Sequence, residues 1–488
     1  MTTTKRAGLT PGTSIVAIVG FLAAVEFASG VLQGFYTPIF TDIARHLSIS
    51  DADINWFEAA QLIVSALCIP LLARLGDLWG HRNVLLLSTA VTAVGSWMLA
   101  FSPSFTTFLI GWAIQGAYVI WLPIEVALIY RRTAGSGRQG QLTRRAAGIL
   151  VGVLELSVIV AALASGALVG TMSMTALLAI PAVVVTLCFF VIWFGITDTP
   201  AEATGRIDWV GFLLVTAGLG LVMGGLISIR LQGVGSAQPW LLIAAGIVVL
   251  AGFVRFESSH PDPLLDVAIF RIPGQWPVQI TAFLFGMSVL GAQIPLSTFA
   301  RTDPAEVGYG LGASAGFVST LIGVYVISMA IGAFTFPVLA RVSGMRGALA
   351  LALVLVAAGY ALWLPFHDTT GQAIMNMLVV GIGSGALVAA LPAAAAASAP
   401  ADRTGLATGL TNGVKTVGGA IASSVFAIAL ASTGSISDPA ANHAPLSGYL
   451  TVWAICSISS LIAAALLFVV PSSAYADPDE DMVVVPTA

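Results

Sequence analysis

Residues 174–196, MTALLAIPAVVVTLCFFVIWFGI, contain no charged side chain over a length that can cross the hydrocarbon core of a bilayer. The rest of the chain has the same character, because 58% of its 488 residues are hydrophobic, 9% are charged and the mean hydropathy is +0.97. A soluble protein carries roughly 25% charged residues to cover its surface. The composition therefore predicts an all-α polytopic membrane protein.

Apolar stretches of similar length follow one another along the chain, with short polar connections between them. They predict fourteen transmembrane helices, at 14–37, 54–74, 83–101, 106–130, 146–171, 174–196, 210–229, 240–254, 276–300, 313–339, 345–365, 372–397, 405–431 and 448–470. Such arrays commonly pair two bundles around a site near the bilayer midplane. We therefore expect two six-helix bundles with two additional helices between them.

The predicted boundaries follow the two longest polar connections. We expect an N-terminal six-helix bundle at 1–196, then cytoplasmic linkers and two additional transmembrane helices at 197–275. A C-terminal six-helix bundle occupies 276–470, and residues 471–488 form an acidic cytoplasmic tail. Within the helices, small residues at Gly30-x-x-x-Gly34 and Gly220-x-x-x-Gly224 predict close helix packing.

The placement of the basic residues predicts the topology. If the amino terminus is cytoplasmic, all but four of the 19 Lys and Arg residues fall on cytoplasmic connections, as the positive-inside rule requires. The exceptions are Arg45, Arg230 and Arg301, which fall outside, and Lys415, which falls within a helix. We expect a multi-pass protein of the inner or plasma membrane with both termini in the cytoplasm.

Several other functions are disfavoured by the sequence. It has no metal-ligand spacing, no phosphate-binding G-x-x-x-x-G-K and no nucleic-acid footprint, so we expect no cofactor, metal or nucleic-acid partner. Residues 312–316 fit the G-x-S-x-G motif of hydrolases, but this motif needs a strand before it, and here it enters a membrane helix. We expect no enzyme, and the energy for any transport must come from a gradient.

Residues 72–82, LARLGDLWGHR, resemble the signature G-x-L-a-D-r-x-G-r-k that joins the second and third helices of the major facilitator superfamily. Asp77, Gly80 and Arg82 fall on the pattern, and His81 takes a place that is usually basic. Glycine permits a tight turn, and charged side chains at helix ends can bind a neighbouring helix reversibly. These four residues are therefore the predicted gate.

The fourteen-helix layout, the pair Asp208-Trp209, and residues 263–266 (PLLD) and 403–409 (RTGLATG) resemble the fourteen-helix drug:proton antiporters of that superfamily. The resemblance implies export of small amphipathic or drug-like compounds in exchange for protons, as in multidrug efflux and antibiotic resistance. Its partners would be the substrate, protons and membrane lipids, and we expect a monomer working by alternating access.

The sequence departs from that branch at several coupling positions. Leu32 stands where those antiporters carry aspartate, Trp112 replaces an arginine, and the fifth helix lacks its Gly-Pro. The second-half counterpart of the gate, 339–346, carries Arg341 where the first half has Asp77. Uncoupled transport and lipid or metabolite transport are therefore alternatives, as is a non-transporting sensor or scaffold.

Carboxylates inside predicted helices offer another route for protons, since a charge at a helix centre costs about 2.5–3.5 kcal/mol and is retained mainly for function. Glu26 and Glu155 fall midway along their helices and are the first candidates for proton coupling, with Glu125 third. Glu58 lies near a helix end. The alternative for each is a neutral, hydrogen-bonded side chain that links helices.

Polar and aromatic side chains within the helices predict a substrate site. Lys415 is three residues after Asn412 and nearly on the same helical face, and a cation there can pair with an acidic substrate or with a glutamate. The predicted substrate-binding residues are Gln33, Trp112, Gln115, Asn412 and Lys415. Helix packing is the alternative for the first three, and snorkelling of the side chain is the alternative for Lys415.

Overall fold

A computed structural model describes residues 15–133, 139–197, 207–261, 263–399, 404–431 and 444–469. The described part is helical, without a β-strand, and thirteen of its stretches are long and apolar enough to cross a membrane. One of these, α14 (Ala315–Leu362), has 48 residues and bends at Gly344, where φ is 71° and ψ is 164°. The bend separates the predicted spans 313–339 and 345–365, so the expectation of fourteen helices is confirmed.

The chain divides into two compact units, each described here by itself. One consists of Met1–Tyr36 with Cys68–Ile207, and the other of Thr37–Leu67 with Asp208–Ala488. Residues 198–206, at the start of the predicted stretch 197–275, and all of the predicted tail at 471–488 lie outside the described residues. The predicted boundaries within the chain stay a prediction.

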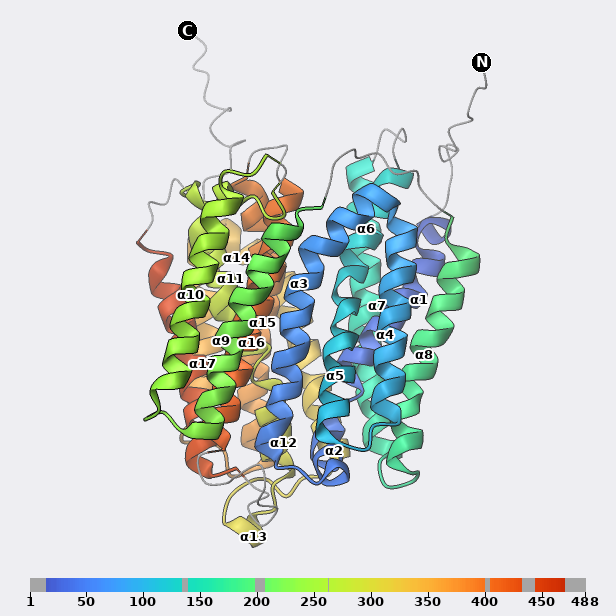
Figure 1. The fold of residues 1–488 in the computed structure, drawn as a ribbon. Coiled ribbons are helices and arrows are strands. Elements are labelled where there is room, and N and C mark those ends of the chain that lie inside the picture. The colour runs from blue at the N-terminus through green and yellow to red at the C-terminus, as the bar shows by residue number, and fades with distance from the viewer. Residues whose placement is uncertain are drawn as a thin grey trace, which may run out of the picture. The chain divides into compact units, whose positions relative to one another are not determined.

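In the first unit the helices are α1 (Ile15–Gly34), the second part of α3 (Asn55–Trp79), α4 (His81–Ala100), α5 (Phe105–Gln115), η3 (Gly116–Ile120), α6 (Trp121–Arg132), α7 (Gln139–Leu168) and α8 (Met174–Gly195). Here α1 packs along α7, and α4 packs along α5 and α8 (Figure 1). The turn η3 interrupts one predicted span, 106–130, in its middle. A 3₁₀ turn inside a helix tightens the backbone and re-aims the helix that follows.

The second unit begins with η1 (Thr37–Ile39), α2 (Phe40–Leu47), η2 (Asp51–Ile54) and the first part of α3. Its remaining helices besides α14 are α9 (Trp209–Gln232), α10 (Ala237–Glu257), η4 (Val267–Arg271), α11 (Gln275–Val289), α12 (Gln293–Arg301), α13 (Pro304–Val307), α15 (Thr370–Ala397), α16 (Thr404–Leu430) and α17 (Leu446–Leu466). Here α9 pairs with α10, α14 with α15 and α17, and α11 with α16.

Glycine allows the closest of these helix contacts. A Cβ on Gly34 of α1 would lie 2.2 Å from the carbonyl oxygen of Val158 on α7, and one on Gly30 would lie 2.5 Å from that of Leu154. In the second unit, a Cβ on Gly286 of α11 would lie 2.0 Å from the carbonyl oxygen of Lys415 on α16. The first and fifth helices of each half therefore pack backbone to backbone.

The predicted packing role of Gly220-x-x-x-Gly224 is wrong, because a Cβ at either glycine would meet no atom within 4 Å. Gly218 and Gly225 on the same helix make the contact instead, against Leu250 and Ile243 of α10. The spacing alone could not identify the buried pair, since α9 offers glycine on more than one face.

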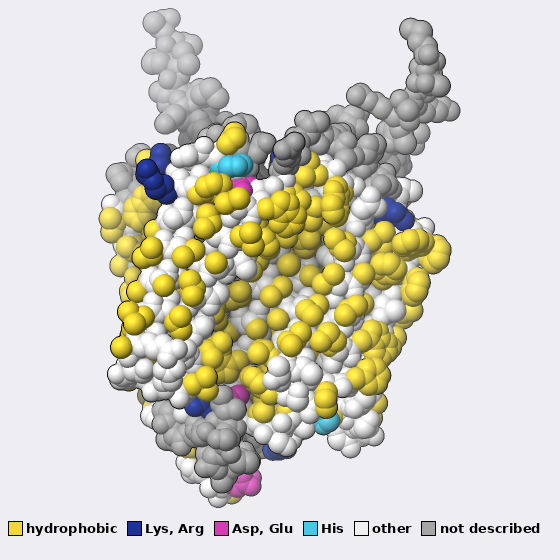
Figure 2. Space-filling model, in the orientation of Figure 1, with side chains coloured by type: hydrophobic (Ala, Val, Ile, Leu, Met, Phe, Trp, Pro, Cys, Tyr) yellow, Lys and Arg dark blue, Asp and Glu magenta, His cyan; other side chains and the backbone are white. Residues whose placement is uncertain are grey.

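Apolar side chains dominate the surface of the helices. Phe194, Phe334 and Val342 are among the most exposed large hydrophobic residues. On the face drawn in Figure 2, hydrophobic side chains extend along the helices, and the charged side chains gather near the helix ends. This distribution fits helices whose sides contact lipid and whose ends contact water.

We expect Gly34→Ala to destabilise the protein by about 1–3 kcal/mol, because the added methyl group forces α1 away from α7. The midpoint of thermal unfolding in detergent measures the effect. Gly20→Ala is the matched control on the same helix, since a Cβ at Gly20 meets nothing within 4 Å. Equal stability of the two variants would contradict the packing described here.

Candidate functional site

Two glutamates from different helices of the first unit face each other in its interior. Glu26 on α1 and Glu125 on α6 are both fully buried, at 0% exposure, and their carboxyl groups interact. The interrupted fourth span accounts for the position of Glu125, because η3 ends one residue before α6 begins at Trp121. Trp121 fixes this start by donating from Nε1 to Ser88 Oγ on α4 at 3.1 Å.

The surroundings of the carboxyl pair are apolar. None of the four carboxyl oxygens receives a hydrogen bond from another group in the described part of the chain, and neither carboxyl forms an ion pair there. The buried thiol of Cys188 on α8 lies within electrostatic range of both. The two carboxyl groups are thus each other's main polar neighbour.

The other predicted carboxylates lie elsewhere. Glu155 is half-buried on α7, the helix that packs against α1. Glu58 is half-buried on the first part of α3, in the second unit. The structure therefore brings together the first-ranked and the third-ranked candidates, Glu26 and Glu125.

Gln115 lies at the centre of a second polar cluster in the same unit. Its Nε2 donates to the hydroxyl of Tyr36 at 3.0 Å and to Ser96 Oγ at 2.9 Å. The ring of Trp112 packs edge-on against Tyr36, with centroids 4.7 Å apart. The Trp112 and Gln115 side chains are thus buried beside the end of α1. Gln33 has an exposed side chain that donates to Ser29 Oγ within its own helix, at 3.2 Å.

Asn412 and Lys415 line a cavity of about 40 Å³ in the second unit, together with Thr411 of the same helix. Helices α11 and α15 supply its apolar walls, which consist of Ala282, Phe285, Leu387, Val388, Leu391 and Pro392. Proline has no backbone N–H, so Pro392 cannot donate the helical hydrogen bond to the carbonyl of Val388. The side chains of α16 thus give the cavity its polar wall, and the side chains of α11 and α15 give it apolar walls.

The predicted gate forms the turn between α3 and α4. Gly80 has φ 94° and ψ 140°, a conformation that a residue with a Cβ adopts only with strain. Asp77 Oδ1 lies 3.4 Å from Nη2 of Arg131 at the end of α6 and 3.9 Å from Nε2 of His81. Arg82 Nη2 donates to the carbonyl of Trp193 on α8 at 2.7 Å. The four predicted residues thus tie together the ends of α3, α4, α6 and α8.

The bend in α14 repeats this turn in the second half of the chain. Gly344 has a positive φ like Gly80, and each glycine is followed two residues later by an arginine. Arg82 reaches the sixth span through Trp193, and Arg346 stacks over the ring of Phe468, 5.1 Å from its centroid, just after the last span. The bend at Gly344 therefore corresponds to the turn at Gly80, although Arg341 replaces the counterpart of Asp77.

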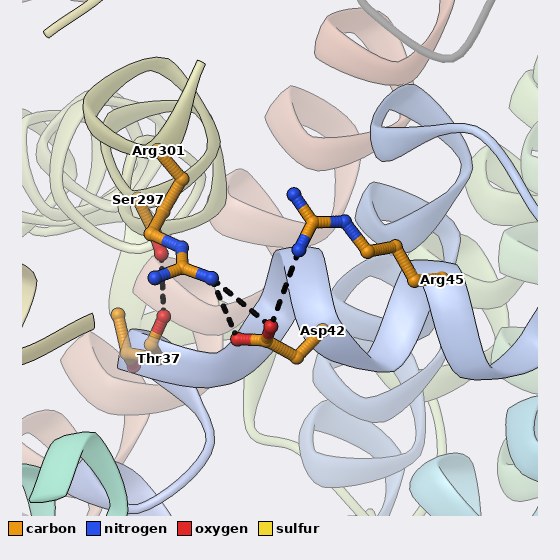
Figure 3. A network of polar contacts seen from close by, with 5 residues as sticks. All are labelled: Thr37, Asp42, Arg45, Ser297 and Arg301. Carbon is orange, nitrogen blue, oxygen red and sulfur yellow. Dashed lines mark hydrogen bonds and ion pairs between the residues drawn. The ribbon is translucent and has the colours of Figure 1, made fainter. Parts of the chain in front are cut away.

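A third group of charges holds the segment Thr37–Leu67, which we call the crossover segment because it belongs to the second unit while the chain on both sides of it belongs to the first. Arg301 Nη2 of α12 donates to both carboxylate oxygens of Asp42 at 3.0 Å, and Ser297 Oγ donates to the carbonyl of Thr37. Figure 3 shows the guanidinium groups of Arg301 and Arg45 approaching Asp42 from different sides.

A second ion pair holds the middle of the crossover segment. Arg230 Nη2 of α9 lies 3.6 Å from Oδ1 of Asp53, which is fully buried and also accepts from Ser50 Oγ at 2.7 Å. Arg45, Arg230 and Arg301 are the three basic residues that the sequence places outside. All three pair with aspartates of the crossover segment, which explains why they depart from the charge rule.

With the fold and these side chains in place, comparison with known proteins identifies the family. The family model described as Major Facilitator Superfamily matches residues 22–423. The chain belongs to the major facilitator superfamily. It is thus a multi-pass membrane protein, and the predicted family resemblance is confirmed.

Several major facilitator proteins resemble this chain at low identity. A uridine/deoxyuridine transporter of Lactococcus lactis subsp. cremoris is 23% identical over 313 residues, 63% of this chain and 64% of that protein. A tetracenomycin C resistance and export protein of Streptomyces glaucescens is 26% identical over 348 residues, 70% of this chain and 62% of that protein. The chain thus matches less than two thirds of the length of either relative.

Solved structures of the superfamily have the same fold. The crystal structure of an auto-inhibited POT family peptide transporter matches with a TM-score of 0.66 at 14% identity, covering 93% of this chain and 96% of that chain. At this identity the match shows the fold alone.

Two motifs that suggested the drug:proton antiporter branch of the superfamily have structural roles here. Asp208 caps α9 by accepting from the N–H of Gly211 at 2.9 Å, and Asp266 caps η4 by accepting from Ala268 at 3.0 Å. Ser314 of the G-x-S-x-G motif likewise caps α14, accepting from the N–H of Phe317. No strand precedes it in the described residues, so the hydrolase motif here is a helix cap.

Sequence reasoning missed several residues of these clusters. In the sequence, nothing distinguishes Tyr36 from the other aromatic residues near helix ends, and nothing distinguishes Arg131 from the other predicted cytoplasmic arginines. Asp42 and Arg301 are distant in the sequence, so no spacing links them. The signal in the sequence for the ion pairs of the crossover segment was the group of three arginines that depart from the positive-inside rule, Arg45, Arg230 and Arg301.

We expect Arg301→Ala to lower the free energy of unfolding by about 1.5–3 kcal/mol, the usual contribution of a hydrogen bond to a charged group. The side chains of Arg301 and Asp42 are only 13% and 16% exposed, so water does not replace the lost bonds fully. Thermal unfolding in detergent measures the change. Arg45→Ala is the control, because this arginine also pairs with Asp42 but is 66% exposed and should contribute little. A larger effect from Arg45 would refute this assignment.

Proposed function

We propose that this major facilitator protein is a secondary active transporter that exports a small amphipathic compound by alternating access, coupled to protons through Glu26 and Glu125. One observation carries the proposal: two carboxyl groups are completely buried side by side in a membrane bundle, without an ion-pair partner in the described residues. Buried ionisable groups in membrane helices are costly and mark ion or proton pathways.

The chemistry of the pair suits proton transfer. Two adjacent carboxylates repel strongly in an apolar interior, so the pair holds at most one negative charge at a time. A proton can pass between the two groups, and its arrival or departure changes the net charge of the site by one. Because Glu26 and Glu125 come from α1 and α6, that change alters the interaction between two helices. Glu155 on α7, a first candidate for proton coupling together with Glu26 by sequence, stays a prediction.

The same helix connects the pair to the other clusters. Tyr36 follows α1 and binds Gln115, and the crossover segment begins at the next residue, Thr37. We propose that a movement of α1 is transmitted to the crossover segment, which its ion pairs hold to α9 and α12. The turn at Gly80 lies at the C-terminal end of α3, and the bend at Gly344 lies at the C-terminal end of the first arm of α14.

The tetracenomycin C resistance and export protein supports export, whereas the other relative is a uridine/deoxyuridine transporter. Protons and an amphipathic compound are the proposed partners, lipid contacts the exposed apolar side chains, and a monomer contains both proposed carriers. The cell or inner membrane, with both termini cytoplasmic, is the proposed location.

Proton movement in proteoliposomes tests the coupling. A pH-sensitive dye inside the vesicles reports protons while amphipathic drugs and dyes are added from outside. We expect Glu26→Gln and Glu125→Gln to reduce substrate-dependent proton movement by about tenfold or more, because an amide cannot exchange a proton. Substrate binding should persist, since glutamine keeps the size of the side chain.

Glu58→Gln is the control, because this glutamate lies outside the pair and its replacement should leave coupling intact. Wild-type proton movement in both Glu26→Gln and Glu125→Gln would show that the pair is not the carrier. Transport by the wild-type protein that does not change with a proton ionophore would instead favour the uncoupled alternative.

A further inference from the structure

We propose that the cavity beside α16 binds the anionic group of an amphipathic organic acid, with Lys415 as its cation. This inference builds on the proposed transport function and assigns a chemical class to its substrate. The observation that carries it is a lysine in the middle of a membrane helix that lines a cavity whose other walls are apolar.

The depth of Lys415 excludes a simple snorkelling role. It lies eleven residues after Thr404 and fifteen before Leu430, which at 1.5 Å per residue is roughly 17 Å and 22 Å from the helix ends. A lysine side chain reaches only a fraction of either distance. A cation held at this depth is costly and marks a substrate or ion pathway.

The cavity has the composition that an amphipathic anion requires. Thr411 and Asn412 line the cavity together with Lys415, and the amide of Asn412 and the ammonium group of Lys415 can donate to a carboxylate. The hydroxyl of Thr411 donates to the carbonyl of Thr408 at 2.7 Å. No Asp or Glu is among the residues that line it. At about 40 Å³ the cavity can hold a single acidic group, while the apolar body of the ligand lies against Phe285 and Leu391.

Helix packing holds the lysine in place. A Cβ on Gly286 would lie 2.0 Å from the carbonyl oxygen of Lys415, and one on Gly418 would lie 2.1 Å from that of Phe283. The backbones of α11 and α16 are therefore in contact at this residue and about one turn after it. A site with a fixed cation binds an anion without first ordering its own backbone, which favours affinity.

A matched pair of probes tests the charge preference. Dansylphenylalanine and its amide have the same apolar body and differ only by the carboxylate, and their fluorescence reports binding to the purified protein in nanodiscs of neutral phosphatidylcholine. We expect the acid to bind about tenfold or more tightly than the amide. Lys415→Met should remove this preference by weakening the acid alone, and Lys415→Arg should retain it. Asn412→Ala should weaken the acid by a smaller factor.

Two controls accompany this measurement, one for folding and one for the source of the anion. Thermal unfolding establishes that Lys415→Met is folded, and Lys415→Gln provides a second, polar replacement that should lose the preference too. Competition by phosphatidylglycerol, lost in Lys415→Met, would assign the anion to a lipid headgroup, whereas no competition would assign it to a free acid.

Equal binding of acid and amide by the wild-type protein, an equal effect of Lys415→Met on both probes, or no saturable binding of either probe would overturn the proposal. The measurement is independent of proton movement. Charge-selective binding without coupling would refute only the proton-coupled function, and coupling without charge selectivity would refute only this inference.

Discussion

The lipid interior offers no hydrogen-bonding partner to a peptide group, and the rest of this structure depends on that constraint. Every span must satisfy its own backbone, so the chain forms helices and packs them through glycine and apolar side chains. In the described residues, the regular α-helix is interrupted at several places that lie next to the clusters of polar and charged side chains. The 3₁₀ turn η3 precedes Glu125. The positive-φ glycines Gly80 and Gly344 precede Arg82 and Arg346, respectively.

The two units handle buried charge differently. The first unit contains the carboxyl pair Glu26 and Glu125, which interact with each other in apolar surroundings. The second unit contains Lys415 in its cavity, and it also contains aspartates that are matched by arginines from other helices. Matched pairs of this kind suit a structural role, because each charge is compensated where it lies. The carboxyl pair suits a role in which a proton provides the compensation, and the cavity lined by Lys415 suits a role in binding a ligand.

Hydropathy predicted the spans because burial in lipid acts on every residue of a helix, and the same signal separated the two arms of α14 at Gly344. The turn between α3 and α4 was predicted because its motif is local in sequence. The contact between Glu26 and Glu125 was not, since it depends on how η3 rotates α6 and on how closely α1 approaches it. Depth along the helix therefore ranked Glu155 above Glu125. Asp42 and Arg301 meet only through the fold, and two charges 259 residues apart leave no pattern to recognise.

The crossover segment has a consequence for how this protein can evolve and be engineered. Residues 37–67 are encoded within the predicted N-terminal bundle at 1–196, yet their aspartates are matched to arginines that lie beyond it, in α9 and α12. A hybrid made by joining the first half of one relative to the second half of another would combine aspartates and arginines that were never selected together. Modular exchange of halves is thus restricted at this point, and compatible hybrids would have to carry the segment along with the helices that it binds.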